Sequence, residues 1–441
     1  MTFRGNARAA GILWAVMGSM ILASCDGDGS PSSSSTSTGT GPATVANSAP
    51  VTVGFGALGP SGQYVNGIWT SVTVCAPGST ANCQTIPNVL VDTGSFGLRL
   101  LSSALTVSLP NMMGTDGNPL QECVEFADFS YTWGPVAAAT IEIPGTGETA
   151  SQVPGQSTNS GVPIQILAAN PSFPVPSSCL PTAPVPGILV DANTVETLGA
   201  NGILGIGVFP QDCGSGCATS ASLDQYFTCP GGRCASVAVP LQLQVWNPVS
   251  AFSSSDTNGV VINLPPVGAS GAASVNGSLI FGIGTQADNS IGSAQIFEVD
   301  QYGNFPQVVF NGVSYTSPNN GSFIDSGSNA IFFSDAASLA STGIFECTGQ
   351  YVGYYCPAST LSFSVTVSGA NHTQTAVSFS VANAANLIGS GLAAFSNIGG
   401  DSGFGPSTDY VDLGIPFFFG RSVFVGMAGA STSYPNGYWA F

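Results

Sequence analysis

Two short acidic turns are the parts of this sequence best suited to chemistry. An apolar run over residues 89–91 leads into Asp92-Thr93-Gly94-Ser95, and Phe323-Ile324 leads into Asp325-Ser326-Gly327-Ser328. An apolar run followed by a Gly-containing turn indicates a strand that ends at a carboxylate. If folding brings the turns face to face, the two carboxylates cannot both ionise easily and tend to share one proton. One can then take a proton from water while the other donates one to a carbonyl oxygen, which is the chemistry of peptide hydrolysis.

The composition leaves few other groups for catalysis. The 441 residues include 23 acidic residues and five basic ones, all Arg, which gives a formal net charge of −18. The single His, His372, lies in a polar, turn-like stretch, so we interpret it as a surface residue. A site built from several His is excluded. Because few groups could neutralise phosphates, we expect no nucleic-acid partner, and we expect no metal or organic cofactor.

The N-terminus has the features of a targeting segment. Arg4 and Arg8 precede an apolar run over residues 10–23, which is too short to span a bilayer. The run ends in Leu22-Ala23-Ser24-Cys25, which resembles the bacterial lipobox and so implies cleavage before Cys25 and lipidation of this Cys. An ordinary signal peptide with an unrelated Cys is the alternative.

We therefore expect a signal peptide over residues 1–24, followed over 25–50 by the lipidated Cys and a flexible Ser/Thr/Gly tether. The folded part is then expected at the bacterial cell envelope, held to a membrane by its lipid, in the periplasm or outside the cell.

The cysteines agree with export. Ten remain once Cys25 is set aside, an even number that suits disulfides in an oxidising compartment. Proximity in sequence favours four local bridges and leaves two Cys for a fifth: Cys75 with Cys83, Cys213 with Cys217, Cys229 with Cys234, Cys347 with Cys356, and Cys123 with Cys179. The four Cys between 213 and 234 could pair otherwise or bind a metal. Disulfides are favoured, because no His assists and an exported set of thiols is more often oxidised.

From about residue 51 the sequence is typical of an all-β protein. Gly (57 residues) and Pro (30 residues) are frequent, and short Val, Ile, Phe and Thr runs alternate with turn signals. Roughly 390 residues are too many for one core, so we expect two units. We assign an N-terminal β lobe to residues 51–238 and a C-terminal β lobe to residues 239–441.

The chain also repeats one pattern. Each half contains an apolar strand, an Asp-Thr/Ser-Gly-Ser turn and, later, an apolar stretch with Gly, at residues 201–207 and 412–417. This order resembles the pepsin-like aspartic peptidases, which have a bilobal β fold, a cleft between the lobes and one catalytic Asp per lobe. Residues 277–284 are similar to the strand that opens the second lobe in that family. As a whole, the chain also looks like an uncharacterised family of bacterial lipoproteins with the same fold.

The resemblance implies a role for each residue of the turns. Asp92 and Asp325 are the expected catalytic dyad, which holds the attacking water. The first hydroxyl residue after each Asp is expected to tie the turns together, the Gly to allow a close approach, and the second hydroxyl to bond the outer carboxylate oxygen. These supporting residues are Thr93, Gly94, Ser95, Ser326, Gly327 and Ser328.

The hairpin that covers the cleft in that family fits less well. Its spacing matches residues 126–134, where Phe126 stands in place of the family's Tyr, and Tyr131 substitutes for that Tyr if the register differs. An aromatic hairpin packed on the core is the alternative. Arg99 occupies the place of the Trp that usually contacts this Tyr. We expect Arg99 to stack on an aromatic side chain of the hairpin, or to lower the pKa of the dyad.

An aspartic endopeptidase anchored at the cell envelope is the leading hypothesis. It is expected to act as a monomer on a peptide or protein substrate that binds as an extended strand. The alternative is a non-catalytic envelope lipoprotein that uses the cleft to bind peptide or polysaccharide. A third Asp-Ser-Gly, at Asp401, follows two Gly rather than an apolar strand, so we interpret it as a loop turn.

Overall fold

The computed structural model describes residues 46–62, 64–168, 173–180, 190–333, 339–403 and 410–441. Strands make up 39% of the structure and helices 12%, which confirms the prediction of an all-β protein. Cys25, the predicted signal peptide and most of the predicted tether lie outside the described residues.

One large sheet system dominates the described part of the chain. Its seventeen strands are β1 (Ser48–Gly54), β2 (Gly67–Cys75), β3 (Cys83–Asp92), β4 (Phe96–Leu101), β5 (Leu120–Glu125), β6 (Ser130–Glu142), β7 (Thr149–Ala150), β8 (Val162–Leu167), β9 (Val190–Asp191), β10 (Gly202–Ile206), β11 (Tyr226–Thr228), β12 (Ala235–Ser236), β13 (Gly259–Leu264), β14 (Val275–Phe281), β15 (Ile296–Glu298), β24 (Arg421–Gly426) and β25 (Tyr438–Ala440).

Two four-stranded sheets complete the β structure of the described residues. The first contains β16 (Gln307–Phe310), β17 (Val313–Thr316), β20 (Leu361–Ser368) and β21 (Gln374–Val381). The second contains β18 (Phe323–Ile324), β19 (Ile331–Phe333), β22 (Gly399–Asp401) and β23 (Asp412–Leu413). The second sheet is small, but it carries the second acidic turn.

The helices of the described part are all short. The α-helices are α1 (Val195–Leu198), α2 (Ser215–Thr219), α3 (Ala384–Ile388) and α4 (Ile415–Phe418). The 3-10 turns are η1 (Gly56–Gly62), η2 (Ser102–Ala104), η3 (Ser177–Cys179), η4 (Pro230–Gly232), η5 (Leu241–Leu243), η6 (Pro248–Ala251), η7 (Ala340–Thr342) and η8 (Gly349–Tyr351). Within the described ranges, no helix has the length and apolar character needed to cross a membrane.

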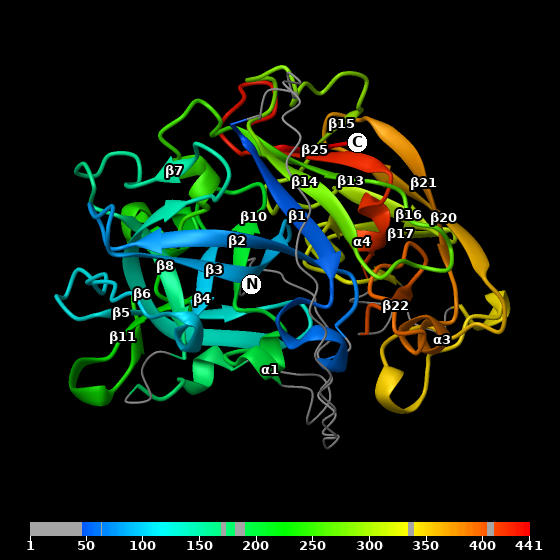
Figure 1. Ribbon diagram of the computed structural model, residues 1–441, viewed down its shortest axis with the longest axis horizontal. Helices are drawn as coiled ribbons and strands as arrows, with labels where there is room; N and C mark the ends of the chain where they lie inside the picture. Colours follow the sequence, from blue (N-terminus) through cyan, green and yellow to red (C-terminus); the bar gives the residue numbers. More distant parts are fainter. Residues whose placement is uncertain (1–45, 63, 169–172, 181–189, 334–338, 404–409) are drawn as a thin grey trace, which may run out of the picture.

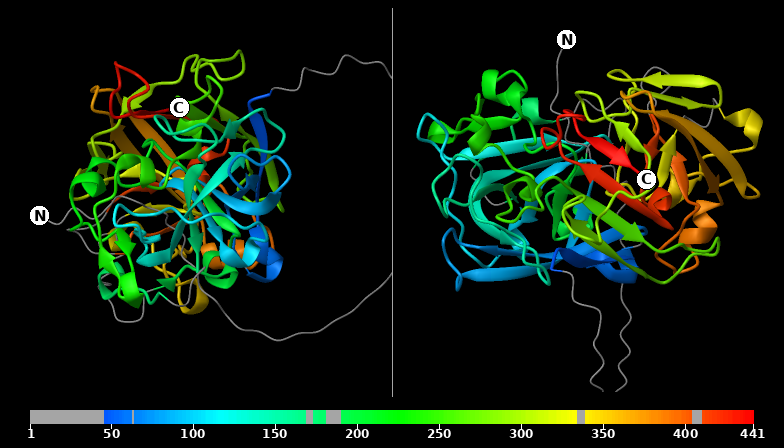
Figure 2. Two further views of the ribbon diagram at one scale, coloured as in Figure 1. Left: turned by 90° about the vertical axis from the view of Figure 1, so that its left-hand side faces the viewer. Right: turned by 90° about the horizontal axis from the view of Figure 1, so that it is seen from above.

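The first and second halves of the chain lie side by side. Figure 1 shows β2 to β11 on one side and β16 to β22 on the other, and the view from above in Figure 2 keeps them apart in the same way. Strand β1 joins the halves, because its Val53 lies opposite Ile68 of β2 and Val275 of β14. The N-terminal strand thus pairs with both halves, and the predicted division between residues 238 and 239 stays a prediction.

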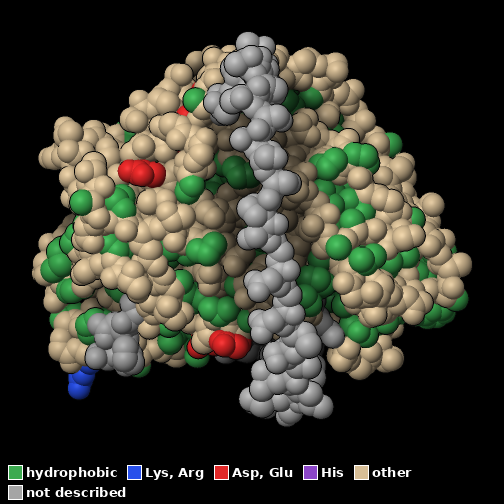
Figure 3. Space-filling model, viewed as in Figure 1, with side chains coloured by type: hydrophobic (Ala, Val, Ile, Leu, Met, Phe, Trp, Pro, Cys, Tyr) green, Lys and Arg blue, Asp and Glu red, His purple; other side chains and the backbone are tan. Residues whose placement is uncertain are grey.

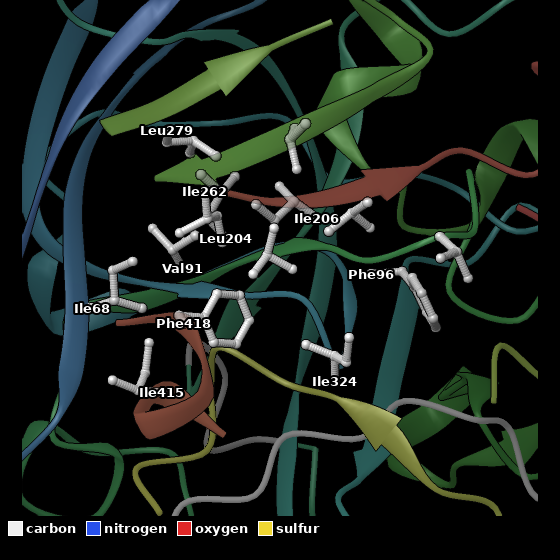
Figure 4. Packing of buried hydrophobic residues seen from close by; sticks show 14 of the residues in the cluster. Ile68, Val91, Phe96, Leu204, Ile206, Ile262, Leu279, Ile324, Ile415 and Phe418 are labelled. Carbon is white, nitrogen blue, oxygen red and sulfur yellow. The ribbon is translucent and has the colours of Figure 1, made fainter. Parts of the chain in front are cut away.

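The largest apolar cluster of the described residues contains side chains from both halves of the chain. Every second side chain of β1 is buried, as expected of a strand with one face on a core. The cluster includes Val91 and Ile324, which directly precede the two acidic turns, and both are fully buried. Figure 4 shows them in one packed group with Leu204, Ile206 and Phe418. The strands that carry the turns are therefore anchored in a common core.

The five predicted disulfides are all present, which confirms that part of the sequence analysis. They join Cys75 to Cys83, Cys123 to Cys179, Cys213 to Cys217, Cys229 to Cys234, and Cys347 to Cys356. Four of the five bridges lie in the first half; Cys75–Cys83 closes the β2–β3 hairpin, and Cys123–Cys179 ties β5 to η3.

Candidate active site

The first acidic turn joins two strands that a third strand separates. β3 ends at Asp92, the chain turns, and β4 begins at Phe96. β10 lies between them, parallel to β3 and antiparallel to β4, so that Leu204 is opposite Val91. The buried apolar strands on either side fix the position of the carboxylate at the end of β3.

The second acidic turn repeats this arrangement. β18 leads into Asp325, and β19 follows the turn. β23 lies between them, parallel to β18 and antiparallel to β19, with Leu413 opposite both Ile324 and Ile331. The sequence pattern of strand, turn and later apolar Gly-containing stretch therefore corresponds to one structural motif that occurs twice.

Reciprocal hydrogen bonds hold the two turns together. The backbone N–H of Ser326 donates to the Thr93 hydroxyl at 2.9 Å, and that hydroxyl lies 3.2 Å from the Ile324 carbonyl, to which it donates. In the other direction, the Thr93 N–H donates to the Ser326 hydroxyl at 3.1 Å, and this hydroxyl donates to the Val91 carbonyl at 2.7 Å. All of these groups are buried, so the two turns act as one rigid unit.

The two carboxylates lie side by side on this unit. The Gly94 N–H is 2.8 Å from Asp92 Oδ1 and 3.1 Å from Asp325 Oδ1, so one backbone donor serves both. The Ser95 hydroxyl donates to Asp92 Oδ2 at 2.5 Å. The Gly327 N–H donates to Asp325 Oδ1 at 2.7 Å. The structure thus brings together the predicted dyad and its predicted supporting residues.

Burial and mutual repulsion keep a proton on this pair. Both Asp92 and Asp325 are fully buried. Burial raises the pKa of Asp92 well above its usual value, and the charge of Asp325 and its hydrogen bond raise it further. The donors Ser95 and Gly94 lower this pKa but do not offset the other two effects. The pair can therefore hold a proton at a pH where an isolated Asp is ionised.

A third buried carboxylate, Asp412, adjoins the dyad. The Ser328 hydroxyl lies 2.5 Å from Asp412 Oδ2 and 2.9 Å from Asp325 Oδ2. Sequence reasoning missed this role. Since Leu413 and Leu204 occupy matching positions in the two motifs, Asp412 matches Ile203. An acidic residue in one copy of an otherwise apolar strand was the available signal.

Tyr64, which precedes β2, was also missed. It is buried against Trp69, with ring centroids 5.3 Å apart. Burial raises its pKa far above the usual value, and the charges of Tyr354, Asp325 and Asp92 raise it further, in that order. The hydroxyl therefore stays protonated close to the dyad. No local motif in the sequence marks this tyrosine.

The predicted hairpin is formed by β5 and β6. Asp128 holds its turn by accepting hydrogen bonds from the N–H and hydroxyl of Ser130, at 2.9 and 2.6 Å. Phe126 is buried in the cluster that contains Tyr64, and the charge of Asp128 reaches Tyr64. Tyr131 is buried in a different cluster, and burial together with Asp191 raises its pKa to about 12. Of the two aromatic candidates, Phe126 thus shares its cluster with a neighbour of the dyad.

The position of Arg99 differs from the expectation. This fully buried guanidinium makes ion pairs at 3.0 Å with Glu122 and with Asp212, and it donates to the Phe96 carbonyl at 2.6 Å. Because Glu122 belongs to β5, Arg99 contacts the hairpin through a carboxylate rather than through an aromatic ring. A buried cation requires such partners, and no local pattern in the sequence indicates which acids supply them.

The third Asp-Ser-Gly, at Asp401, forms the same local turn but follows neither β3 nor β18, the strands that carry the other two turns. The Gly403 N–H donates to Asp401 Oδ1 at 2.9 Å, like the corresponding Gly of the other turns. Asp401 ends β22 and is only partly buried, so this copy belongs to neither motif. Among the described residues, no group of three or more His, Cys, Asp or Glu is arranged to hold a metal ion.

No curated protein matches this chain. A family model does match it, over residues 43–441, and this range includes both acidic turns, the hairpin and Asp412. The chain therefore belongs to the family described as "Protein of unknown function (DUF3443)".

Proposed function

We propose that this protein is an aspartic endopeptidase of the pepsin-like, bilobal kind, which hydrolyses peptide bonds with a water activated by Asp92 and Asp325. One observation carries the proposal. Two acidic turns from separate halves are joined by reciprocal hydrogen bonds, and a single N–H, that of Gly94, reaches both carboxylates. A pair of this kind that holds one proton contains both a general base and a general acid.

The reaction uses the proton that the pair retains. The ionised carboxylate takes a proton from a water held between the two side chains as the water oxygen bonds to the carbonyl carbon of the substrate, and the protonated carboxyl donates its proton to the carbonyl oxygen. When this tetrahedral species collapses, the C–N bond breaks, the leaving nitrogen receives the proton taken from water, and the proton of the carbonyl oxygen returns to the pair. The raised pKa of Asp92 supports this division, because it reflects a carboxyl that gains from keeping a proton. The Ser95 and Ser328 hydroxyls orient the outer oxygens.

The substrate in this proposal is an extended peptide bound across the dyad. Backbone hydrogen bonds would supply affinity, and pockets for side chains would supply selectivity. The hairpin of β5 and β6 would cover the peptide, while the protonated Tyr64 hydroxyl near the dyad is available to donate to a backbone carbonyl. The lipid anchor at Cys25 and the location at the bacterial cell envelope remain part of the proposal.

Cleavage of a denatured protein, followed from acid to neutral pH, tests the proposal. We expect cleavage that a statine-type transition-state analogue abolishes. Asp92→Asn and Asp325→Asn should each abolish it as well. Asp401→Asn is the matched control, because it alters the same Asp-Ser-Gly sequence at a partly buried position outside the two motifs; it should leave the activity unchanged.

Two results would count against a peptidase. Cleavage that survives both dyad substitutions would place the chemistry elsewhere. Peptide or polysaccharide binding without cleavage at any pH would favour the non-catalytic binding protein.

A further inference from the structure

A pocket with a volume of about 630 Å³ is lined by no residue of either acidic turn. It is bounded on one side by the β20–β21 hairpin and on the other by α4 and the start of β24. Its main side chains are Phe363, Phe379, Phe417, Phe419 and Arg421. This volume is in the range that holds a small organic molecule. None of the residues that hold the dyad lines the pocket, so it is a separate site.

Arg421 is the unusual feature of this pocket. The described part of the chain contains three Arg: Arg99 is buried and ion-paired, and Arg233 is exposed. Arg421 is half-buried and, among the described residues, has no carboxylate within ion-pair distance. In a protein with 23 acidic residues and five basic ones, a partly buried cation without a counter-ion is unexpected.

The structure holds this cation in place at the pocket wall. The guanidinium lies 4.6 Å from the ring centroid of Phe417 and donates one hydrogen bond, at 2.5 Å, to the Phe417 carbonyl. A guanidinium has five N–H donors, so most remain available. Burial lowers the pKa of Arg421, but an arginine stays protonated under ordinary conditions. The charge is thus fixed, partly desolvated and able to bind an anionic group.

The rest of the pocket suits an apolar body. Phe363 and Phe379 lie opposite each other in the β20–β21 pair, with ring centroids 5.7 Å apart. Both rings are only half-buried although they pack on the core, so part of each faces the pocket. Ser362, Ser364, Ser378 and Ser380 of the same two strands also line the pocket.

We propose that this pocket binds a small organic anion with an apolar body, whose anionic group pairs with Arg421 and whose body lies on Phe363 and Phe379. The charge decides the ligand class, since a neutral apolar molecule leaves the guanidinium unpaired. Such a site is independent of peptide hydrolysis, so it stands whether or not the protein is a peptidase.

A matched pair of fluorescent dyes tests the proposal on the purified full chain with its disulfides intact. Anilinonaphthalene sulfonate has an aromatic body and an anionic group, and phenylnaphthylamine has the same body without the sulfonate. We expect saturable binding of one sulfonate dye per chain. Arg421→Met should weaken that binding at least about tenfold, equivalent to about 1.4 kcal/mol, and should leave the neutral dye unaffected.

Two further variants separate charge from packing. Arg421→Lys keeps the charge and should restore most of the affinity, while Arg233→Met removes an exposed cation elsewhere and should change nothing. Near-ultraviolet circular dichroism checks that each variant retains its packed core. Absence of saturable binding would overturn the proposal. So would an equal loss for both dyes in Arg421→Met, or an equal effect of Arg233→Met.

Discussion

Among the buried carboxylates of the described residues, two pairs are held in opposite ways. Glu122 and Asp212 share the Arg99 guanidinium, at 3.0 Å each, and the Tyr226 hydroxyl donates to Asp212 at 2.6 Å. Asp92 and Asp325 accept only from neutral N–H and O–H groups in the contacts described above, and no described Arg lies within ion-pair distance of them. The first pair has a counter-ion, whereas the second relies on a shared proton.

The two pairs differ in their partners rather than in the direction of their pKa shifts. Burial and the neighbouring Glu122 raise the pKa of Asp212 well above its usual value, and Arg99 and Tyr226 reduce that rise without offsetting it. At Asp92 only the hydrogen bonds from Ser95 and Gly94 act against it. Under the proposed function, the pair that shares Arg99 links segments of the fold, whereas the pair without a cation supplies the transferred proton. Figure 3 shows few charged side chains on the face that it displays.

Removal of Arg99 should produce the largest change in stability. Arg99→Met leaves Glu122 and Asp212 buried without their cation, which should lower the free energy of unfolding by about 3–5 kcal/mol. Urea denaturation at neutral pH, with disulfides intact, measures this. Arg233→Met, at an exposed position, should change the value by less than about 0.5 kcal/mol. A loss below about 1 kcal/mol for Arg99→Met would mean that the cation does not hold this pair.

The spacing of the dyad can be altered without touching its charges. A Cβ on Gly327 would lie 2.7 Å from Asp92 Oδ1 and 3.1 Å from Asp325 Oδ1, so Gly327→Ala must push the carboxylates apart. We expect kcat/KM for peptide cleavage to fall about 100-fold, because small displacements at a reacting centre are costly.

A second glycine provides the control for this change. Gly147 is exposed and has no atom within 4 Å of an added Cβ, so Gly147→Ala should retain full activity. Binding of the statine-type analogue gives a second readout for Gly327→Ala, and it should weaken in parallel. Unchanged cleavage and unchanged binding would show that the observed spacing is not the reactive one.

The raised pKa of Asp92 should also make the stability of the protein depend on pH. Because the pKa of Asp92 is raised in the folded state, the stability linked to this group is complete below the unfolded pKa of about 4. It is lost as the pH rises through the higher folded pKa. The side chain at position 92 of the variant Asp92→Asn does not titrate in this pH range. The free energy of unfolding of the variant should therefore decline less steeply above pH 4 than that of the wild type. Each unit by which folding raises the pKa of Asp92 contributes up to about 1.4 kcal/mol to this difference.

Urea denaturation at a series of pH values checks this slope. Asp401→Asn, at the partly buried turn, should follow the wild-type curve. Glu122→Gln instead breaks the ion pair with Arg99 and should lower stability across the range. Parallel curves for Asp92→Asn and wild type would show that the dyad holds no extra proton.

Features of the fold and the site that depend on neighbouring residues could be predicted from the sequence, and features that depend on contacts between distant segments could not. The acidic turns and the disulfides could be predicted, because strand, turn residue and Cys spacing are local signals. The partners of Arg99 could not, since Glu122 lies on β5 and Asp212 in the loop before α2, and the packing of these distant segments decides which acid reaches the guanidinium. Tyr64 was missed for the same reason: its position near the dyad depends on how the segment before β2 packs.

The contact of Asp412 with the dyad also depends on distant segments, so the sequence did not predict it. Substitution of Asp412 is expected to have the smallest effect of the changes considered. The Ser328 hydroxyl has one proton and lies within bonding distance of both Asp412 and Asp325. When Ser328 donates to an ionised Asp412, Asp325 loses this donor and feels a second negative charge nearby. Both effects favour the protonated form of Asp325. The first motif has Ile203 at the matching position, so only the second Asp experiences them.

Asp412→Asn removes the charge and frees the Ser328 proton for Asp325. The higher of the two apparent pKa values of the dyad should then fall, because Asp325 loses a neighbouring negative charge and gains a hydrogen-bond donor. The alkaline limb of the pH profile of kcat/KM would move to lower pH. Ile203→Val, at the matching position in the first motif, should leave the profile in place. A lower kcat with an unshifted profile would mean that Asp412 supports only the packing of β23, and that the two turns are electrostatically equivalent.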